Sequence, residues 1–313
     1  MKQVGVFFGS RSPEHDISIL TAMRVIAGFR ALPLYRTIPV YIDRKGEWFA
    51  DEDLSNIEFF RQPRLEERLA PYAVSSISFA DHALTLLSRR KFFRRGRPIK
   101  IELAFPCIHG SLGEDGTIQG LFEMAGVPYV GCGVRASAIA MSKIHTRRLL
   151  GAVGIPGVPT VVISREEFGQ KRRESMGRAT KELSFPVFVK PNALGSSIAV
   201  SAAANEKELE WALEVAFQFD TTALVEKAIR NLKEVNVAVI GHHDLIISET
   251  EEPQFKSGFQ TFEEKYLIKG GTLRQEKGKA KSKIPAELPA DVAAALKDAA
   301  RTAFRRLGAS GIS

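Results

Sequence analysis

The sequence predicts an α/β protein with more than one domain, and three observations lead to that prediction. Short apolar runs such as residues 4–8 have the composition of buried strands. Amphipathic segments with helical spacing follow several of these runs, for example over residues 14–30. Polar, glycine-rich loops lie between strand and helix, where open α/β sheets bind their ligands. With 313 residues and 44% hydrophobic content, the chain is long enough for two or three such domains.

The amino-terminal part is predicted to begin with a strand at 4–8, a loop at 9–13 and a helix from about residue 14 to residue 30. A hairpin is expected from Ala83 to Phe105, because Gly96 and Pro98 interrupt an extended pattern. Its last part, 101–105, is apolar apart from Glu102 and is predicted to be a largely buried strand. We expect this first α/β domain to end near Gly131.

The most informative segment is the loop and helix that follow this strand, residues 106–131. The loop carries His109, Glu114 and Asp115 among glycines, and such a loop is suited to meet a ligand. A tight turn with solvated carboxylates is the alternative. The next residues predict a helix that Gly126 ends and Pro128 prevents from resuming. The inward positions of this helix repeat with helical spacing: Ile118, Leu121, Phe122 and Ala125.

The second half of the chain is predicted to start with a helix over 136–152 and a turn over 154–159. Strands are expected at 160–163 and 184–191, and a helix follows with Asn205 as its N-cap and Glu208 at the third position. Strands at 223–225 and 235–240 are assigned to a third, larger sheet. The inward face of the helix after Asn205 is predicted to hold Leu209, Ala212, Leu213 and Ala216.

A last helix is predicted over residues 288–308, closed by Gly308. Its inward face is expected to consist of Val292, Leu296, Ala299, Ala303 and Phe304.

A phosphate-binding loop is predicted after Lys190. The sequence has neither GxxxxGK[ST] nor GxGxxG after a strand, so another type of cradle is required. Lys190 ends an apolar run, and residues 192–197 then offer unhindered amides and two hydroxyls next to its ammonium group. Anionic oxygens fit such a turn. The alternative is a solvated surface lysine before a hairpin turn.

Composition excludes several other classes of protein. Cys107 and Cys132 lack the spacing of a disulfide framework or a zinc site, which fits a reducing cytoplasm. No signal peptide and no apolar run of about 20 residues is found, so no membrane partner is expected. Much of the net charge of +8 lies in residues 89–100 and 274–283. Such charge runs are typical of solvated turns, and no nucleic-acid partner is expected.

Residues 109–143 resemble the corresponding stretch of D-alanine:D-alanine ligases, the ATP-grasp enzymes that make the dipeptide of the bacterial cell wall. Residues 4–18, 185–201, 224–239 and 261–267 resemble further blocks of this family in the same order. The resemblance implies an N-terminal α/β substrate domain at 1–133, a central ATP-grasp subdomain at 134–222 and an incomplete C-terminal ATP-grasp subdomain at 223–313. It also implies ATP with Mg²⁺ or Mn²⁺, D-alanine as substrate, a cytoplasmic location and a homodimer.

The resemblance assigns an ATP site. Lys143 and Lys190 would contact the phosphates, together with Lys265 and the loop hydroxyls. Glu234 would take the ribose hydroxyls. The complete set implied for ATP is Lys143, Lys190, Ser196, Ser197, Glu226, Lys227, Ala228, Ile229, Glu234 and Lys265, in which residues 226–229 line the adenine pocket.

The resemblance also assigns an amino-acid site. Glu14 would receive the first D-alanine's ammonium group, although a carboxylate at a helix start also favours the helix without any ligand. His109 would lie near that substrate's carboxylate, with a merely structural histidine as the alternative. Ser196 and Tyr266 would join Glu14 in bridging the first loop to a lid at 254–283, which must exclude water from an acyl phosphate. Tyr266 favours an amine over a hydroxy acid as second substrate.

Three departures from the family pattern are visible. Ser142 stands where an aspartate is common and Leu194 where a glutamate is common. The family's magnesium ligands and an arginine would lie beyond Ser313, so the chain is predicted to be a truncated ligase that does not ligate, with a natural non-catalytic descendant as the alternative. A D-alanine:D-lactate or D-serine ligase and a non-catalytic nucleotide-binding module also remain open.

Overall fold

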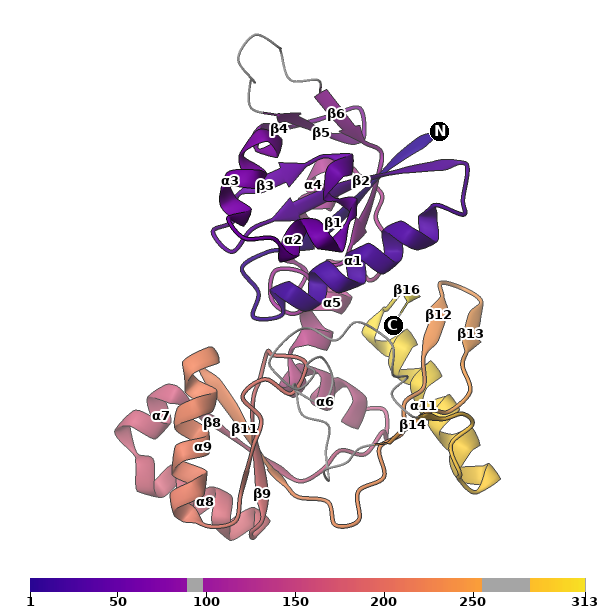
Figure 1. Cartoon of the computed structure of the whole chain (residues 1–313). Helices are drawn as coiled ribbons and strands as arrows, with labels where there is room; N and C mark the ends of the chain where they lie inside the picture. The colour runs from indigo at the N-terminus through magenta and orange to yellow at the C-terminus, as the bar shows by residue number, and fades with distance from the viewer. Residues whose placement is uncertain (89–97, 255–281, 313) are drawn as a thin grey trace. The chain divides into compact units, whose positions relative to one another are not determined.

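The computed structural model describes residues 1–88, 98–254 and 282–312, which form two compact units (Figure 1). The first unit comprises residues 1–138 with 310–312, and the second comprises residues 139–309. Most of the two basic segments and of the lid candidate at 254–283 lies outside the described residues. Among the helices of the described ranges, none has the length and hydropathy needed to span a membrane.

A four-stranded sheet with both faces covered forms the centre of the first unit. Its strand order is β3 (Trp48–Ala50), β2 (Tyr35–Ile42), β1 (Lys2–Gly9) and β7 (Leu103–Pro106), and β1 is parallel to both of its neighbours. Successive side chains of β1 point to opposite faces. Val6 and Phe8 pack in the cluster with α1 (His15–Phe29), whereas Phe7 packs with α4 (Thr117–Ala125). This two-sided burial explains why β1 reads as a continuous apolar run, as predicted.

Smaller elements complete the two faces of this sheet (Figure 1). On the α1 side lie η1 (Glu52–Ser55), α2 (Ile57–Arg61), α3 (Leu65–Leu69) and η2 (Ala70–Tyr72), which supply Leu54 and Leu69 to the cluster. An antiparallel sheet of β4 (Val74–Ala80), β5 (Ala83–Ser88) and β6 (Pro98–Ile101) contributes Leu84, Leu86 and Ile101 to the other cluster.

The predicted hairpin from Ala83 to Phe105 is only partly confirmed. β5 and β6 do pair, but the hairpin ends at Ile101 and the chain then enters the central sheet as β7. Glu102 marks the crossing, and its carboxylate accepts a hydrogen bond of 3.0 Å from the backbone N–H of Gln3. The alternation of apolar residues predicted strands correctly on both sides of Glu102, but it carries no information about which sheet each strand joins.

The helix predicted over 136–152 is two helices, α5 (Val134–Met141) and α6 (Lys143–Gly151). Ser142 between them has an extended backbone, and its hydroxyl accepts a hydrogen bond from the N–H of His145. Serine competes with the helical backbone in this way and is favoured at N-caps. The single-helix prediction is therefore wrong at this residue.

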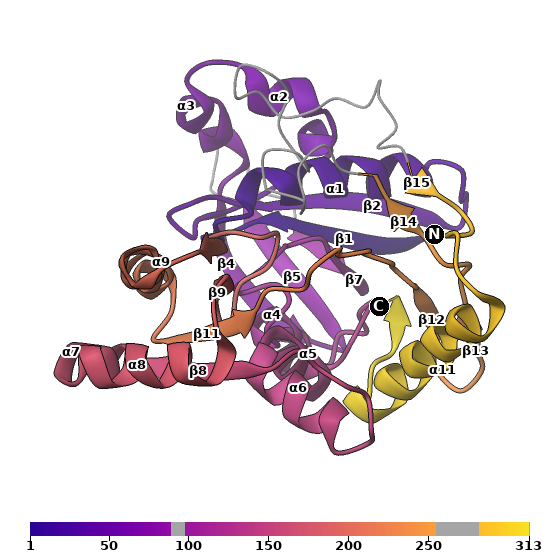
Figure 2. The ribbon, with the colours of Figure 1, turned by 90° about the horizontal axis from the view of Figure 1, so that it is seen from below.

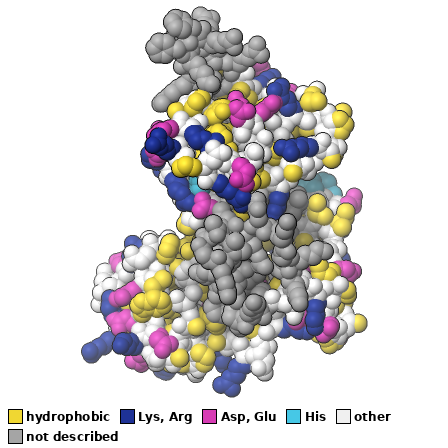
Figure 3. All heavy atoms as spheres, in the orientation of Figure 1, with side chains coloured by type: hydrophobic (Ala, Val, Ile, Leu, Met, Phe, Trp, Pro, Cys, Tyr) yellow, Lys and Arg dark blue, Asp and Glu magenta, His cyan; other side chains and the backbone are white. Residues whose placement is uncertain are grey.

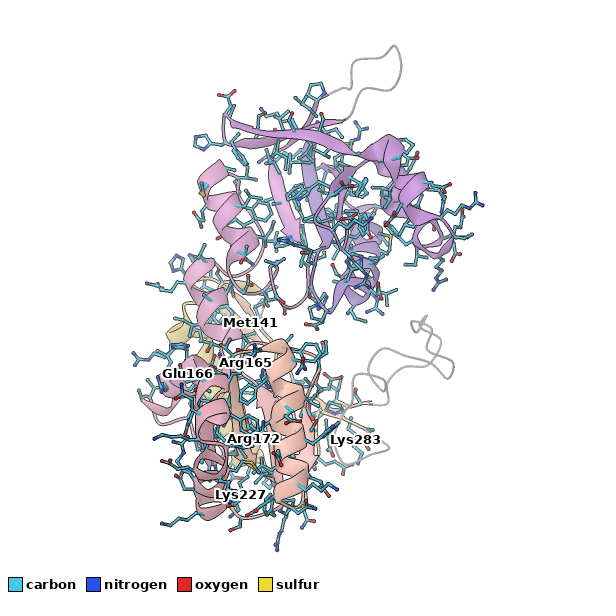
Figure 4. The ribbon with its side chains drawn as sticks, turned by 90° about the vertical axis from the view of Figure 1, so that its left-hand side faces the viewer. Met141, Arg165, Glu166, Arg172, Lys227 and Lys283 are labelled. Atoms are coloured by element: carbon cyan, nitrogen blue, oxygen red, sulfur yellow. The ribbon has the colours of Figure 1, made fainter. Side chains whose placement is uncertain are left out.

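The second unit is built on an antiparallel sheet with one helical face. The strand order is β10 (Ser201–Ala203), β9 (Val187–Pro191), β11 (Thr222–Lys227) and β8 (Thr160–Ser164). The helices α7 (Arg165–Gln170), α8 (Arg172–Leu183) and α9 (Glu206–Phe219) cover one face of it (Figures 2 and 4). Arg172 at the start of α8, labelled in Figure 4, forms ion pairs with Glu210 and Glu214 of α9.

Strand β11 lies in this central sheet, so the assignment of residues 223–225 to a third sheet is wrong. Its register pairs it with both β8 and β9. The predicted start of α9 is confirmed: the Asn205 side chain accepts from the N–H of Glu208 at 3.0 Å, and the Glu208 carboxylate accepts from the N–H of Ala204 at 2.8 Å. Its predicted buried residues are all buried: Leu209, Ala212, Leu213 and Ala216.

The last described elements are short strands and one long helix. β12 (Val239–Gly241) pairs with β13 (Leu245–Ile247), and β14 (Glu252–Pro253) pairs with β15 (Ser282–Lys283). Helix α11 (Ala290–Leu307) packs against α6 and β13 and ends at Gly308 with φ +70, as predicted, before β16 (Gly311–Ile312). Of its predicted inward residues only Phe304 is buried, and Val292 is 40% exposed.

Charge is mixed on the described surface in Figure 3, where acidic and basic side chains are interspersed. Several of them form exposed ion pairs, among them Arg44 with Asp16 and Lys45 with Glu66. Such pairs contribute little to stability, so the fold depends on its apolar clusters.

We expect Phe122→Ala to destabilise the first unit by about 3–5 kcal/mol. Phe122 is fully buried and its ring lies 4.9 Å from that of Phe7, so truncation leaves a cavity between α4 and the sheet. Met124 on the same helix is 86% exposed, and Met124→Ala serves as the matched control. Urea denaturation followed by circular dichroism measures both. Equal shifts of the two midpoints would contradict the packing described above.

Candidate active site

The second unit contains a cavity of about 680 Å³ on the sheet face opposite the helices α7, α8 and α9. Val187, Val189 and Val225 face the helical core, so the alternating residues Phe188, Lys190 and Glu226 point to the other side of the sheet. The cavity is lined by side chains of α6, of the strands β9 and β11, and of the loops that flank them: Lys143, Arg147, Val158, Phe188, Lys190, Leu194, Gly195, Ser196, Ser197, Val200, Glu226, Lys227, Ile229, Leu232 and Glu234.

A buried carboxylate lies at the polar end of this cavity. The Glu226 side chain is 4% exposed, and two cations bind it. Arg147 Nη2 lies 2.6 Å from Oε1, and Lys190 Nζ lies 2.8 Å from Oε2. A buried carboxylate requires such partners, because an unpaired charge out of water is strongly unfavourable. Lys190 is therefore an element of a charge cluster and not a solvated surface lysine.

Lys143, the first residue of α6, donates from Nζ to the backbone carbonyls of Leu194 and of Asn192, the latter at 3.3 Å. Burial and, after it, the nearby charge of Lys190 lower the pKa of Lys143 to about 8. A site that gathers cations without enough anions lowers their pKa in this way. The arrangement is suited to an anionic ligand.

The loop between β9 and β10 has a strained backbone. Ser196, Ser197 and Ala199 all have positive φ, at +51, +59 and +56. Left-handed residues other than glycine are strained and cluster at ligand sites. The loop is fixed at its start, because the Asp220 carboxylate accepts from the N–H of Ala193 at 2.7 Å.

The residues implied for adenine and ribose lie at the same cavity. Glu226, Lys227, Ile229 and Glu234 line it, and Ala228 stands between them in the chain. Lys227, labelled in Figure 4, ends β11. Its N–H donates to the carbonyl of Pro159 at 3.1 Å. The structure thus brings the described members of the ATP set together around one cavity, and their roles towards ATP remain predictions.

Sequence reasoning missed Arg147, Asp220 and the side-chain contacts of Asn192. Arg147 stands four residues after Lys143 on α6, so helical spacing indicates that the two share a face. The Asn192 side-chain oxygen accepts from the N–H of Ile144 and from the hydroxyl of Ser142, both at 3.1 Å, which ties the loop to the start of α6. Asp220 gave no signal in the sequence beyond its turn-like setting.

The two local departures from the family pattern have structural explanations. Ser142 caps α6, a task that aspartate also performs. Leu194 is buried in the cavity wall, and it binds Lys143 through its backbone carbonyl, which any residue would supply.

The first unit carries the predicted amino-acid residues in a loop cluster of its own. Glu14 is buried at the N-cap position of α1, so both its predicted ligand role and the alternative of a carboxylate that favours the helix start stay open. Gly110, with φ +70, lies against it: a Cβ there would stand 2.4 Å from Oε2 of Glu14. Ser12 joins the two loops, because its hydroxyl donates to the carbonyl of His109 at 2.6 Å.

His109 is half-buried, and its Nε2 lies 2.7 Å from Oγ1 of Thr21 on α1. This contact, absent from the sequence prediction, orients the ring, and it suits both a substrate-facing and a merely structural histidine. His15, next to Glu14, donates from Nδ1 to the carbonyl of Ser10 at 2.6 Å, and Tyr41 donates to its Nε2 at 3.0 Å. Burial lowers the pKa of His15, which favours the neutral ring. The two hydrogen bonds of this ring hold the start of α1 in place.

Lys265 and Tyr266 lie outside the described residues. Glu14 and Ser196 lie in different units, so their predicted contact across a closed lid stays a prediction.

The fold and the site define a class of protein. A one-sided antiparallel sheet carries lysines and a strained loop on its open face, and a separate α/β unit carries a second loop cluster. This is the organisation of an ATP-grasp ligase. Residues 3–132 match the family model described as "D-ala D-ala ligase N-terminus", and residues 149–313 match "D-ala D-ala ligase C-terminus". The chain belongs to the D-alanine–D-alanine ligase family.

Individual relatives agree with this assignment. The chain is 37% identical over 312 residues to the D-alanine–D-alanine ligase of Thermosipho melanesiensis, which covers 99% of this chain and 81% of the relative. The structure is similar to that of the VanG D-Ala:D-Ser ligase from Enterococcus faecalis, with a TM-score of 0.75, 30% identity, and coverage of 100% of this chain and 84% of the other. The structure is also similar to that of the D-alanine–D-alanine ligase of Coxiella burnetii. The TM-score is 0.75, the sequence identity is 26%, and the match covers 100% of this chain and 80% of the other.

Gly110→Ala should destabilise the first unit by about 1–3 kcal/mol, because a non-glycine residue is strained at positive φ and the new Cβ displaces the Glu14 carboxylate. The control is Gly120→Ala within α4, where a Cβ meets nothing within 4 Å. Alanine is the better helix former there and should stabilise by about 0.5–1 kcal/mol. Thermal unfolding should thus show a lower midpoint temperature for Gly110→Ala and a higher one for Gly120→Ala. Shifts in the same direction would contradict the close approach at Gly110.

Proposed function

We propose that this protein joins two D-alanine molecules at the expense of ATP, through an acyl phosphate, to give D-alanyl-D-alanine for peptidoglycan. The observation that carries the proposal is the cavity of the second unit. It gathers Lys143, Lys190, Glu226 and Glu234 with the strained loop at 196–199, which are the residues and the loop that the family resemblance assigns to ATP. Family membership supports the same reaction.

ATP would lie with its base among the apolar wall residues and its phosphates at the charged end. Val158, Phe188 and Leu232 offer the flat, apolar surroundings that a purine requires. Lys143, Lys190 and the N–H groups of the loop would hold the phosphates through charge-assisted hydrogen bonds. Glu234, half-buried at the rim, would accept from the ribose hydroxyls.

The reaction has two steps. A carboxylate oxygen of the first D-alanine attacks the γ-phosphorus of ATP, the bond to ADP breaks, and an acyl phosphate forms. The amine of the second D-alanine then attacks the acyl carbon, a C–N bond forms, phosphate leaves, and the amine loses a proton. Positioning and charge neutralisation are the main contributions of a protein to phosphoryl transfer. Lys143 and Lys190 would supply both at the transferred group.

Glu14 and His109 are proposed to hold the first D-alanine. The Glu14 carboxylate would pair with the substrate's ammonium group, and His109, oriented by Thr21, would lie near its carboxylate. Ser196 and Tyr266 are proposed to act with Glu14 when the lid closes, and Lys265 to contact a phosphate. The three-domain division at 133/134 and 222/223 likewise stays a prediction.

Mg²⁺, or Mn²⁺ in its place, is proposed as the ion that accompanies ATP, and a homodimer as the assembly, both on the family resemblance. Within residues 1–88, 98–254 and 282–312 no three His, Cys, Asp or Glu side chains are grouped so as to hold a metal ion. We therefore assign none of the described residues to the ion.

The second substrate separates the proposal from its closest rival. One structural neighbour is a D-Ala:D-Ser ligase, so D-serine is the specific alternative. Phosphate release from ATP should depend on D-alanine, and mass spectrometry of the product with D-alanine, D-serine or D-lactate supplied in competition identifies the second substrate. Nucleotide binding without D-alanine-dependent phosphate release would favour a non-catalytic nucleotide-binding module.

We expect Lys190→Met to weaken ATP binding by about 1.5–3 kcal/mol, the usual contribution of a hydrogen bond to a charged group. Calorimetry measures the dissociation constant directly. Lys207 is exposed on α9, away from the cavity lining, and Lys207→Met is the control with the same loss of charge. Equal effects of both substitutions would mean that net charge, and not the cavity, determines affinity.

ATP affinity should fall as the pH rises from about 7 to 9. The lowered pKa of Lys143, about 8, means that the ammonium is present below this pH and is lost above it. Lys143→Arg keeps its charge at all these pH values and should make affinity nearly independent of pH. An unchanged pH dependence in this variant would show that another group titrates.

A further inference from the structure

The Glu226 carboxylate is shared between two cations that are held in different ways. Each oxygen has its own partner, Arg147 at Oε1 and Lys190 at Oε2. In the proposed function Lys190 must also bind the nucleotide phosphates. It cannot serve the carboxylate and a phosphate equally, so nucleotide binding changes the charge balance around Glu226.

Arg147 is anchored in a way that prevents it from following a ligand. Its Nη1 donates to the hydroxyl of Thr160 and to the carbonyl of Val158, the latter at 3.3 Å, while Nη2 holds Glu226. Thr160 is the direct partner of Glu226 in the register of β8 and β11, so the guanidinium spans both strands from α6. Because the planar guanidinium makes several hydrogen bonds at once, it is held in one position.

Lys190 is held differently. Its side chain is about as exposed as that of Arg147, 30% against 31%, but it holds Glu226 through a single ammonium group on a flexible stem. Lys143 is not a partner of the carboxylate in the structure, where its ammonium donates to the carbonyls of Asn192 and Leu194.

We propose that Arg147 is a positioning residue, which keeps the buried Glu226 carboxylate neutralised so that Lys190 is free to turn to the nucleotide phosphates. The inference rests on the proposed function and adds a residue to it. Without Arg147, departure of Lys190 would leave a buried charge unpaired, which is strongly unfavourable. Lys190 would then stay on Glu226, and the phosphates would lose a cation although Lys190 itself is intact.

The test compares ATP with adenosine, which has the base and ribose but no phosphates. Calorimetric dissociation constants are measured for the wild type, Arg147→Met, Arg147→Lys and the control Arg148→Met, whose arginine is exposed on the same helix. Arg147→Met should lower ATP affinity about tenfold or more, as expected for loss of one charged hydrogen bond, and leave adenosine affinity nearly unchanged. Arg147→Lys should recover much of the loss, and Arg148→Met should show none.

A second variant distinguishes this role from simple damage to the fold. In Arg147→Met/Glu226→Gln the carboxylate is gone, so Lys190 is released and the ratio of ATP to adenosine affinity should return towards that of the wild type. Equal loss of both ligands in Arg147→Met, or no recovery of the ratio in the double variant, would overturn the proposal. If the wild type binds neither ATP nor adenosine, the proposed function fails, and this inference fails with it.

Discussion

The burial of one carboxylate, that of Glu226, constrains most of the second unit. A charge with 4% exposure must be neutralised, and the two cations that do so come from different elements, Arg147 from α6 and Lys190 from β9. Because Arg147 also binds Thr160, the same guanidinium fixes α6 against β8 and β11. The cavity therefore has its charged wall in place before any ligand enters, which is the condition for tight binding at low entropic cost.

The phosphate loop depends on a second set of polar contacts. Asn192 accepts a hydrogen bond from the N–H of Ile144 in α6, and Asp220 at the end of α9 accepts one from the N–H of Ala193. The loop is therefore tied to two helices. Residues 196–199 can then keep left-handed conformations that a free loop would abandon. The first unit uses the same principle at its loop cluster, where Ser12 and His15 bind backbone carbonyls and hold the segment around Glu14.

Two departures from the sequence predictions, at Glu102 and at strand β11, have one cause: periodicity indicates which residues are buried, but not against which neighbours they pack. Ser142 is a different case, because its effect is local. The helix pattern continues across it in the sequence, yet its hydroxyl caps the second helix. Strand β11 carries the apolar residues of any buried strand, and only its pairing with β8 and β9 places it in the central sheet.

The sequence by itself determined what depends on near neighbours in the chain. The capping of α9 by Asn205, the ends of helices at Gly126 and Gly308, and the apolar face of α9 all follow from local backbone and side-chain chemistry. The family resemblance also predicted Lys143, Lys190 and Glu234 for one site, and these residues line one cavity. Only the tertiary structure decided the partners: Arg147 and Glu226 are 79 residues apart, and Ser12 and His109 are 97 apart. Pairs so distant leave no periodic trace, because contact between them is decided by how the strands and helices pack together.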